Sequence, residues 1–157
     1  MQVTSGPPAP LQDPPTFAHF EAGPLADWRR WEFTHPLIAR QLRGKVFVQE
    51  RLGLTGLELS LSVLPPGAGV PFLHRHRRNE EVYVFVAGRG QFQVDGVCFA
   101  IGEGSVVRVS PAGRRSYRNT GDVPLVFLVI QAPAGTGASA TISDGEALPE
   151  PPVWPQP

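Results

Sequence analysis

The sequence predicts an all-β domain of the antiparallel sandwich or barrel type. Apolar and polar side chains alternate along short segments, which is the period-two pattern of half-buried strands. The clearest examples cover residues 57–63, 81–86 and 91–94. Turn signals rich in Gly, Pro, Asn and Asp separate about eight or nine such segments, as expected for a protein built of antiparallel sheets.

The individual elements follow from the same two signals. Asp95-Gly96 between two alternating segments predicts a hairpin, because these residues suit the left-handed positions of a two-residue turn. One short helix is expected near residues 25–32 or 35–43, where apolar contacts are available from Trp28, Trp31 and Leu37. Further strands are expected over residues 46–50, 97–100, 105–109, 115–118 and 125–131.

Proline distribution places the folded part in the middle of the chain. Of 18 prolines in 157 residues, five fall within residues 1–15 and five within residues 149–157. Proline lacks the amide hydrogen that helices and inner strands need. We therefore expect a disordered tail over 1–15, an N-terminal segment over 16–44, a β-barrel over 45–131 and a flexible Pro-rich tail over 132–157.

Charge and cysteine content exclude several classes of function. Fourteen basic and 14 acidic side chains give a formal net charge of zero, which creates no general field for nucleic acid or an anionic membrane. The single cysteine excludes an internal disulfide and a cysteine-based zinc site. No apolar segment approaches the roughly 20 residues of a membrane span, and no signal peptide is recognisable. We expect a cytoplasmic protein without nucleic-acid or membrane partners.

A metal-binding pattern lies before the second alternating segment. On an extended chain His74 and His76 point to the same face, about 7 Å apart at Cα. Glu81 begins the next predicted strand and can reach the same site. Two imidazoles and one carboxylate form a suitable site for Fe, Mn, Ni or Zn. An isolated His-x-His is by default a pair of surface histidines, so the residues around it must show whether it is a metal site.

Two glycines complete a family pattern around these residues. Gly69, His74, His76, Glu81 and Gly88 have the spacing G-x4-H-x-H-x4-E-x6-G, which resembles the first conserved motif of the cupin superfamily. The departure is one residue between the first glycine and the first histidine. Residues 104–119 resemble the second cupin motif. The resemblance covers roughly residues 44–131 and implies a small single-domain cupin, a β-barrel or jelly-roll sandwich.

The second motif departs from the family at a metal ligand. Cupins that bind metal through four side chains take the last ligand, a histidine, from this motif. Alignment on Asn119 places Arg115 there, whereas alignment on the preceding Pro-x-Gly places Ser116 there. An inward-facing Arg115 would need an anionic partner, because a lone buried charge is very costly. Glu81 or a bound ligand could be that partner.

Three functions remain open. In the first, His74, His76 and Glu81 bind a divalent ion, and Arg115 and Tyr83 contact a small, anionic substrate. The resemblance then implies a metal-dependent enzyme of the dioxygenase, decarboxylase, lyase or isomerase class. It also implies a homodimer.

The other two functions need no metal. In one, the barrel binds a small polar ligand or acts like the metal-free sugar isomerases and epimerases of this fold class. In the other, the barrel serves in assembly, and apolar side chains such as Phe85 and Phe92 fill its pocket. A direct contact between Arg115 and Glu81 that leaves no room for an ion would favour a metal-free barrel.

Overall fold

A computed structural model describes residues 16–35, 40–137 and 142–155. Its strands are β1 (Glu32–His35), β2 (Arg40–Arg43), β3 (Lys45–Phe47), β4 (Glu58–Leu64), β5 (Asn79–Ala87), β6 (Arg89–Val94), β7 (Val97–Gly102), β8 (Val106–Val109), β9 (Arg115–Asn119) and β10 (Leu125–Pro133). The helices are the 3-10 turns η1 (Leu25–Arg30) and η3 (Ile142–Asp144) and one turn of α-helix, α1 (Gln49–Leu52).

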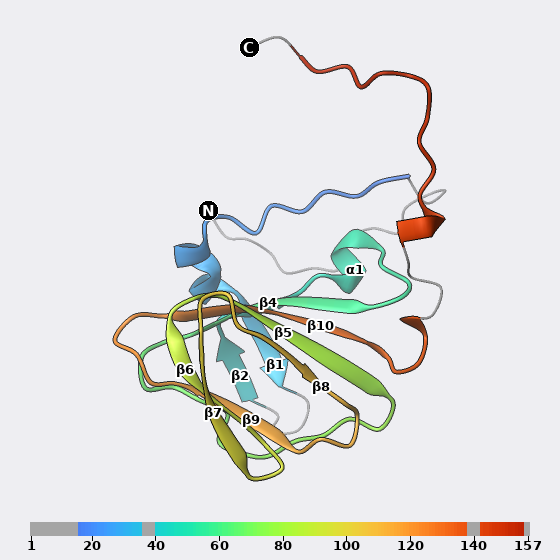
Figure 1. Ribbon diagram of the computed structural model, residues 1–157. Helices are drawn as coiled ribbons and strands as arrows, with labels where there is room; N and C mark the ends of the chain where they lie inside the picture. Colours follow the sequence, from blue (N-terminus) through green and yellow to red (C-terminus); the bar gives the residue numbers. More distant parts are fainter. Residues whose placement is uncertain (1–15, 36–39, 138–141, 156–157) are drawn as a thin grey trace.

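The strands form three antiparallel sheets. One sheet has the strand order β3-β4-β10-β5-β8, a second has β7-β6-β9, and β1 pairs with β2 alone. The five-stranded and three-stranded sheets face each other as the two layers of a sandwich (Figure 1). The predicted all-β sandwich is therefore confirmed, as is the Asp95-Gly96 hairpin between β6 and β7, whose two turn residues both have positive φ.

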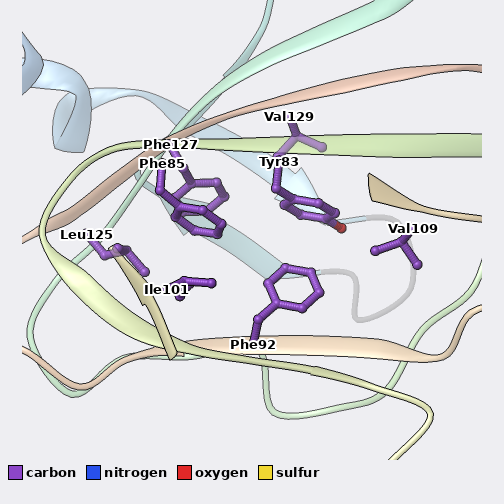
Figure 2. Close-up of a cluster of buried hydrophobic side chains, with 8 residues drawn as sticks. All are labelled: Tyr83, Phe85, Phe92, Ile101, Val109, Leu125, Phe127 and Val129. Carbon is purple, nitrogen blue, oxygen red and sulfur yellow. The ribbon is translucent and has the colours of Figure 1, made fainter. Parts of the chain in front are cut away.

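Aromatic and aliphatic side chains fill the space between the layers. Alternate residues of β5 and β10 point inward and meet side chains from β6, β7 and β8 (Figure 2). The cluster consists of Tyr83, Phe85, Phe92, Ile101, Val109, Leu125, Phe127 and Val129. Phe92 is fully buried and packs against Phe85 and Tyr83 at ring-centroid distances of 6.3 and 4.9 Å.

The outer face of the five-stranded sheet is covered by the N-terminal segment. Trp28 of η1 packs on Val63 of β4 and Val126 of β10, and its indole N–H donates to the Gly23 carbonyl at 3.0 Å. A short helix within 25–32 is thus confirmed, in 3-10 form. Over the alternative window, residues 40–43 form strand β2 instead, and residues 36–39 lie outside the described part.

The prediction of one strand over 46–50 is wrong in its second half. β3 ends at Phe47, and α1 follows, ending at Gly53 with the left-handed φ of 65°. The tail predicted over residues 1–15 lies outside the described residues. Beyond β10, the described residues contain only η3 (Figure 1). No described helix has the length and apolar content needed to cross a membrane.

Candidate metal centre

The two histidines are carried on an extended segment that runs beside β9. His74 exchanges two backbone hydrogen bonds with Arg115, of 3.1 and 3.0 Å. The His76 amide donates to the Pro111 carbonyl at 3.0 Å. Because the segment is extended, both rings project to the same side, and their centroids lie 5.9 Å apart.

Glu81 reaches the same place from β5. It pairs with Gln131 of β10 on one side and with Val109 of β8 on the other, so its backbone is fixed in the middle of the five-stranded sheet. Its side chain points into the sandwich, like that of Tyr83 two residues later, and is almost fully buried. Glu81, Tyr83 and Phe85 alternate along β5, and all three side chains are buried on its inner face.

Three potential ligand atoms converge at this end of the barrel. One donor atom from each of His74, His76 and Glu81 lies within 4.8 Å of the others. His76 Nε2 is 3.1 Å from Glu81 Oε1. Nevertheless, His74 Nδ1 and His76 Nε2 are buried without a well-formed hydrogen bond among the described residues. Orphaned buried nitrogens are costly, and an ion between them would satisfy both.

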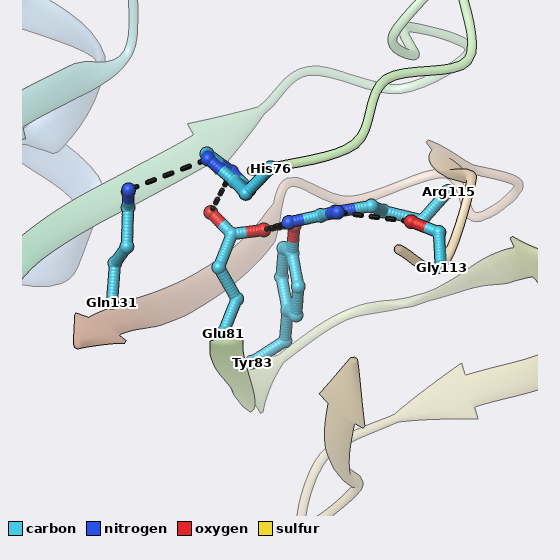
Figure 3. A network of polar contacts seen from close by, with 6 residues as sticks. All are labelled: His76, Glu81, Tyr83, Gly113, Arg115 and Gln131. Atoms are coloured by element: carbon cyan, nitrogen blue, oxygen red, sulfur yellow. Dashed lines mark hydrogen bonds and ion pairs between the residues drawn. The ribbon is translucent and has the colours of Figure 1, made fainter. Parts of the chain in front are cut away.

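The second oxygen of Glu81 is occupied by the protein itself. Oε2 accepts hydrogen bonds from the Tyr83 hydroxyl at 2.5 Å, from Arg115 Nε at 3.0 Å and from Arg115 Nη2 (Figure 3). Arg115 Nη1 donates to the Gly113 carbonyl at 2.9 Å. All three guanidinium nitrogens are thus engaged, while Oε1 faces His76.

Burial and these contacts set the protonation of the site. Burial, with the nearby charge of Arg115, lowers the pKa of His74 to about 4. Burial opposes ionisation of Glu81, but hydrogen bonds from Tyr83 and Arg115 hold its pKa below the usual value. Burial strongly raises the pKa of Tyr83. At neutral pH the site therefore offers a neutral His74 imidazole and an ionised carboxylate, which are the forms that bind metal.

The structure resolves which residue of the second motif faces the site. Arg115 is fully buried and points at Glu81. Ser116 points away, and its hydroxyl donates to the Val70 carbonyl at 2.7 Å. The anionic partner that an inward Arg115 was expected to need is Glu81. All five residues predicted from the sequence, His74, His76, Glu81, Tyr83 and Arg115, lie together.

Comparison with known proteins identifies the family. The chain matches the sequence profile of the cupin domain over residues 60–131. A cupin protein from Bacteroides fragilis is 39% identical, with a TM-score of 0.63, and the alignment covers 66% of this chain and 88% of that one. The chain belongs to the cupin superfamily. It spans about half the length of the curated relatives it matches, 59% and 54%.

Two further relatives of this cupin have names that refer to a ligand or an activity. The oxalate-binding protein of Thermotoga maritima is 36% identical over 67 residues, which cover 43% of this chain and 54% of that protein. A putative sugar phosphate isomerase from Acidithiobacillus ferrooxidans is 26% identical, with a TM-score of 0.52 and coverage of 56% and 57%. The predicted membership of a small cupin domain family is confirmed.

Sequence reasoning missed several polar residues of the cupin interior. The serines of β4, Ser60 and Ser62, point into the sandwich and are buried, while Leu61 lies on the opposite face toward Trp28. Lys45 of β3 pairs with Ser62 and shares its direction. Gln131 of β10 places its amide nitrogen 3.4 Å from His76 Nδ1. Alternation alone shows that a strand has two faces but does not say which one is interior.

Proposed function

We propose that this cupin binds a divalent metal ion through His74, His76 and Glu81 and uses it to bind or transform a small anionic molecule. Fe, Mn, Ni and Zn all suit two imidazoles and a carboxylate. The observation that carries the proposal is the pair of buried imidazole nitrogens without hydrogen bonds, beside Glu81 Oε1, the carboxylate oxygen that Tyr83 and Arg115 do not contact. A three-ligand site leaves coordination positions open for water or substrate.

The surrounding contacts support a ligand role for each of the three groups. Tyr83 and Arg115 bind only Oε2 of Glu81, so they orient the carboxylate with Oε1 toward His76. Such outer contacts are typical of metal ligands. With the Gln131 amide turned over, so that its oxygen rather than its nitrogen faces His76 Nδ1, a proton on Nδ1 would leave the Nε2 lone pair for the ion. The protein groups thus fit the ion that the family often binds.

The packing of the barrel and the names of its relatives support a small ligand. The rings of Tyr83, Phe92 and Tyr117 pack together inside the barrel beside the polar site, so a ligand there would have to be small. One relative is named for binding oxalate, and another is described as a putative sugar phosphate isomerase, and both names refer to small anions. The reaction class, whether dioxygenase, decarboxylase, lyase or isomerase, stays open, because one fold supports all of them.

The substrate contacts predicted for Arg115 and Tyr83 remain predictions. Every guanidinium nitrogen of Arg115 already has a partner within the protein, and the Tyr83 hydroxyl donates to Glu81. These contacts support a positioning role, in which both residues act on the substrate through Glu81. The homodimer and the cytoplasmic location also remain predictions.

A specific observation favours a metal-free barrel as the second candidate. The Arg115 guanidinium contacts Glu81 directly, and a fixed cation beside the carboxylate disfavours a dication through charge repulsion. In that case the pocket would bind a small polar ligand or act as a sugar isomerase or epimerase. The metal site is ranked first because Glu81 Oε1 faces the histidines rather than Arg115, and because two buried imidazole nitrogens lack hydrogen bonds.

The test is the metal content of tag-free protein, measured by mass spectrometry after incubation with each metal and desalting. We expect near-stoichiometric metal in the wild type and a loss of most of it in His76→Ala. His19→Ala is the matched control, because His19 is exposed and its ion pair within the described residues is with the exposed Glu21. Equal metal in both variants, or none in the wild type with any of the four metals, would overturn the proposal.

A further inference from the structure

Lys45 has an unusual position for a lysine. It is the only lysine of the chain. On β3 it pairs with Ser62, and Ser62 in turn pairs with the core residue Phe127 of β10. Directly opposed residues of antiparallel strands point to the same face, so the half-buried Lys45 side chain lies on the barrel-facing side of the sheet.

The ammonium group extends toward the polar end of the barrel. Nζ lies 4.9 Å from the ring centroid of Phe47, two residues along β3. Phe47 lies in the same row across the sheet as Ser60, Val129 and Tyr83, one row from Glu81. The ammonium group therefore points toward the candidate metal centre. Burial lowers the pKa of Lys45, and the negative charges of Glu81 and Glu58 oppose that shift.

No described residue pairs with this ammonium group. Each ion pair within the described ranges uses an arginine or a histidine as its cation, and no hydrogen bond from Lys45 is present. Its cross-strand neighbour Ser62 is 3% exposed, and the Ser62 hydroxyl is also buried without a hydrogen-bond partner. The Ser62 hydroxyl and the Lys45 ammonium are thus adjacent donors on the inner face of the sheet without a hydrogen-bond acceptor among the described residues, an arrangement that suits a bound ligand.

We infer that Lys45 binds the carboxylate of a small organic acid, with the Ser62 hydroxyl as a further donor. This inference rests on the proposed metal site. Charge supports an acid as the ligand. The facing groups are two cations, Lys45 and Arg115, and two anions, Glu81 and Glu58. They cancel, so a bound dication leaves an excess of about two positive charges, which a small dicarboxylate would neutralise. Anion binding should therefore require the metal.

Oxalate serves as the probe, because it is the smallest dicarboxylate. Its affinity for the metal-loaded protein is measured by calorimetry for the wild type, Lys45→Met, Lys45→Arg and Ser62→Ala, with metal content determined on each sample. Arg89→Met is the matched control, because it removes one positive charge from an exposed site at the start of β6. Inorganic phosphate and glycerol are compared with oxalate.

Since Lys45 is the only lysine, a small amine reagent also reports on it directly. Peptide mass spectrometry gives the extent of labelling of Lys45 with and without oxalate, relative to the α-amino group of the same molecule. We expect oxalate to slow the labelling of Lys45 at least about fivefold, and glycerol to leave it unchanged. This readout does not depend on any catalytic activity.

We expect Lys45→Met to weaken oxalate binding at least about tenfold, with full metal content, as for the loss of a charged hydrogen bond. Ser62→Ala should weaken oxalate binding less than Lys45→Met does. Lys45→Arg should keep much of the wild-type affinity, and Arg89→Met should leave the affinity unchanged. An affinity within twofold of wild type in metal-loaded Lys45→Met, or tighter binding of phosphate than of oxalate, would overturn the inference. Absence of metal from the wild type would instead overturn the proposed function and, with it, this inference, which requires the bound ion.

Discussion

Arg115 and Glu81 form a buried ion pair that uses only one oxygen of the carboxylate. Nε donates to Oε2 at 3.0 Å and Nη2 to the same atom, while Oε1 lies 3.1 Å from His76 Nε2. Arg115 occupies the position where the second cupin motif places a metal-binding histidine. The arginine therefore does not replace the ligand. It fixes the carboxylate that the first motif supplies, and this division of the two oxygens leads to testable consequences.

Arg115→Met should destabilise the metal-free protein by about 3 kcal/mol or more, because it leaves a buried carboxylate without its cation. The adjacent pair supplies the control. Glu80 and Arg108 also form an ion pair, at 2.6 Å, but with 61% of the Arg108 side chain exposed. Arg108→Met should cost at most about 1 kcal/mol. Urea unfolding measures the loss of stability in both variants. Similar losses would contradict the conclusion that Arg115 compensates a buried charge.

Tyr83→Phe removes one of the three donors to Oε2 and keeps the ring that packs on Phe92. We expect a loss of about 1.5–3 kcal/mol in unfolding free energy, because the hydroxyl binds a charged group. The pH at which metal uptake is half-complete should rise, because Glu81 becomes easier to protonate. Tyr117→Phe is the matched control for Tyr83→Phe, because Tyr117 packs in the same cluster and makes no side-chain hydrogen bond within the described residues.

Acid should destabilise the metal-free protein in two stages. The folded-state pKa of His74 is about 4, below its usual 6.5, so the unfolded chain binds more protons between these values and stability falls as pH decreases through this range. The pKa of Glu81 is also lowered, so its contribution is present at neutral pH and is lost below about 4.5.

Urea midpoints measured at pH 7, 5.5 and 4.5 give this dependence. His74→Gln should flatten the fall between pH 6.5 and 4, and His19→Gln, at an exposed site, should not. The same pH dependence in wild type and His74→Gln would contradict the neutral, buried state of His74.

Local spacing made the main part of the site predictable. His74 and His76 share a face because their segment is extended, and Glu81, Tyr83 and Phe85 share one because they alternate on β5. The contact between Arg115 and Glu81 spans 34 positions, yet it followed from chemistry, since an inward arginine needs an anion.

Other features depended on tertiary structure. The alternation of leucine and serine in β4 fits either face inward, and only packing against Trp28 puts the leucines outside and the serines within the barrel. Lys45 was therefore not predicted at the site. Likewise, α1 was not predicted. It has a single turn, and the left-handed Gly53 that caps it is a weaker sequence signal for a helix than the preceding apolar residues are for a strand.

The last glycine of the first motif allows two segments of the chain to approach each other closely. Gly88 joins β5 to β6 with φ of 83°, and a Cβ there would lie 2.4 Å from the Pro124 carbonyl oxygen. Gly96 in the β6–β7 turn has nearly the same φ, 87°, but no neighbour within 4 Å. Gly96→Ala should thus cost only the left-handed strain, about 1–2 kcal/mol.

Gly88→Ala carries the same strain and must also displace the Pro124 backbone next to Leu125, a fully buried core residue. We expect its cost to exceed that of Gly96→Ala by at least about 2 kcal/mol, among the larger effects of single substitutions. Thermal unfolding of the two variants measures the difference. Equal costs would mean that the motif requires glycine at this position for its backbone conformation alone, and that the β5–β6 turn can move away from Pro124 without disturbing the core.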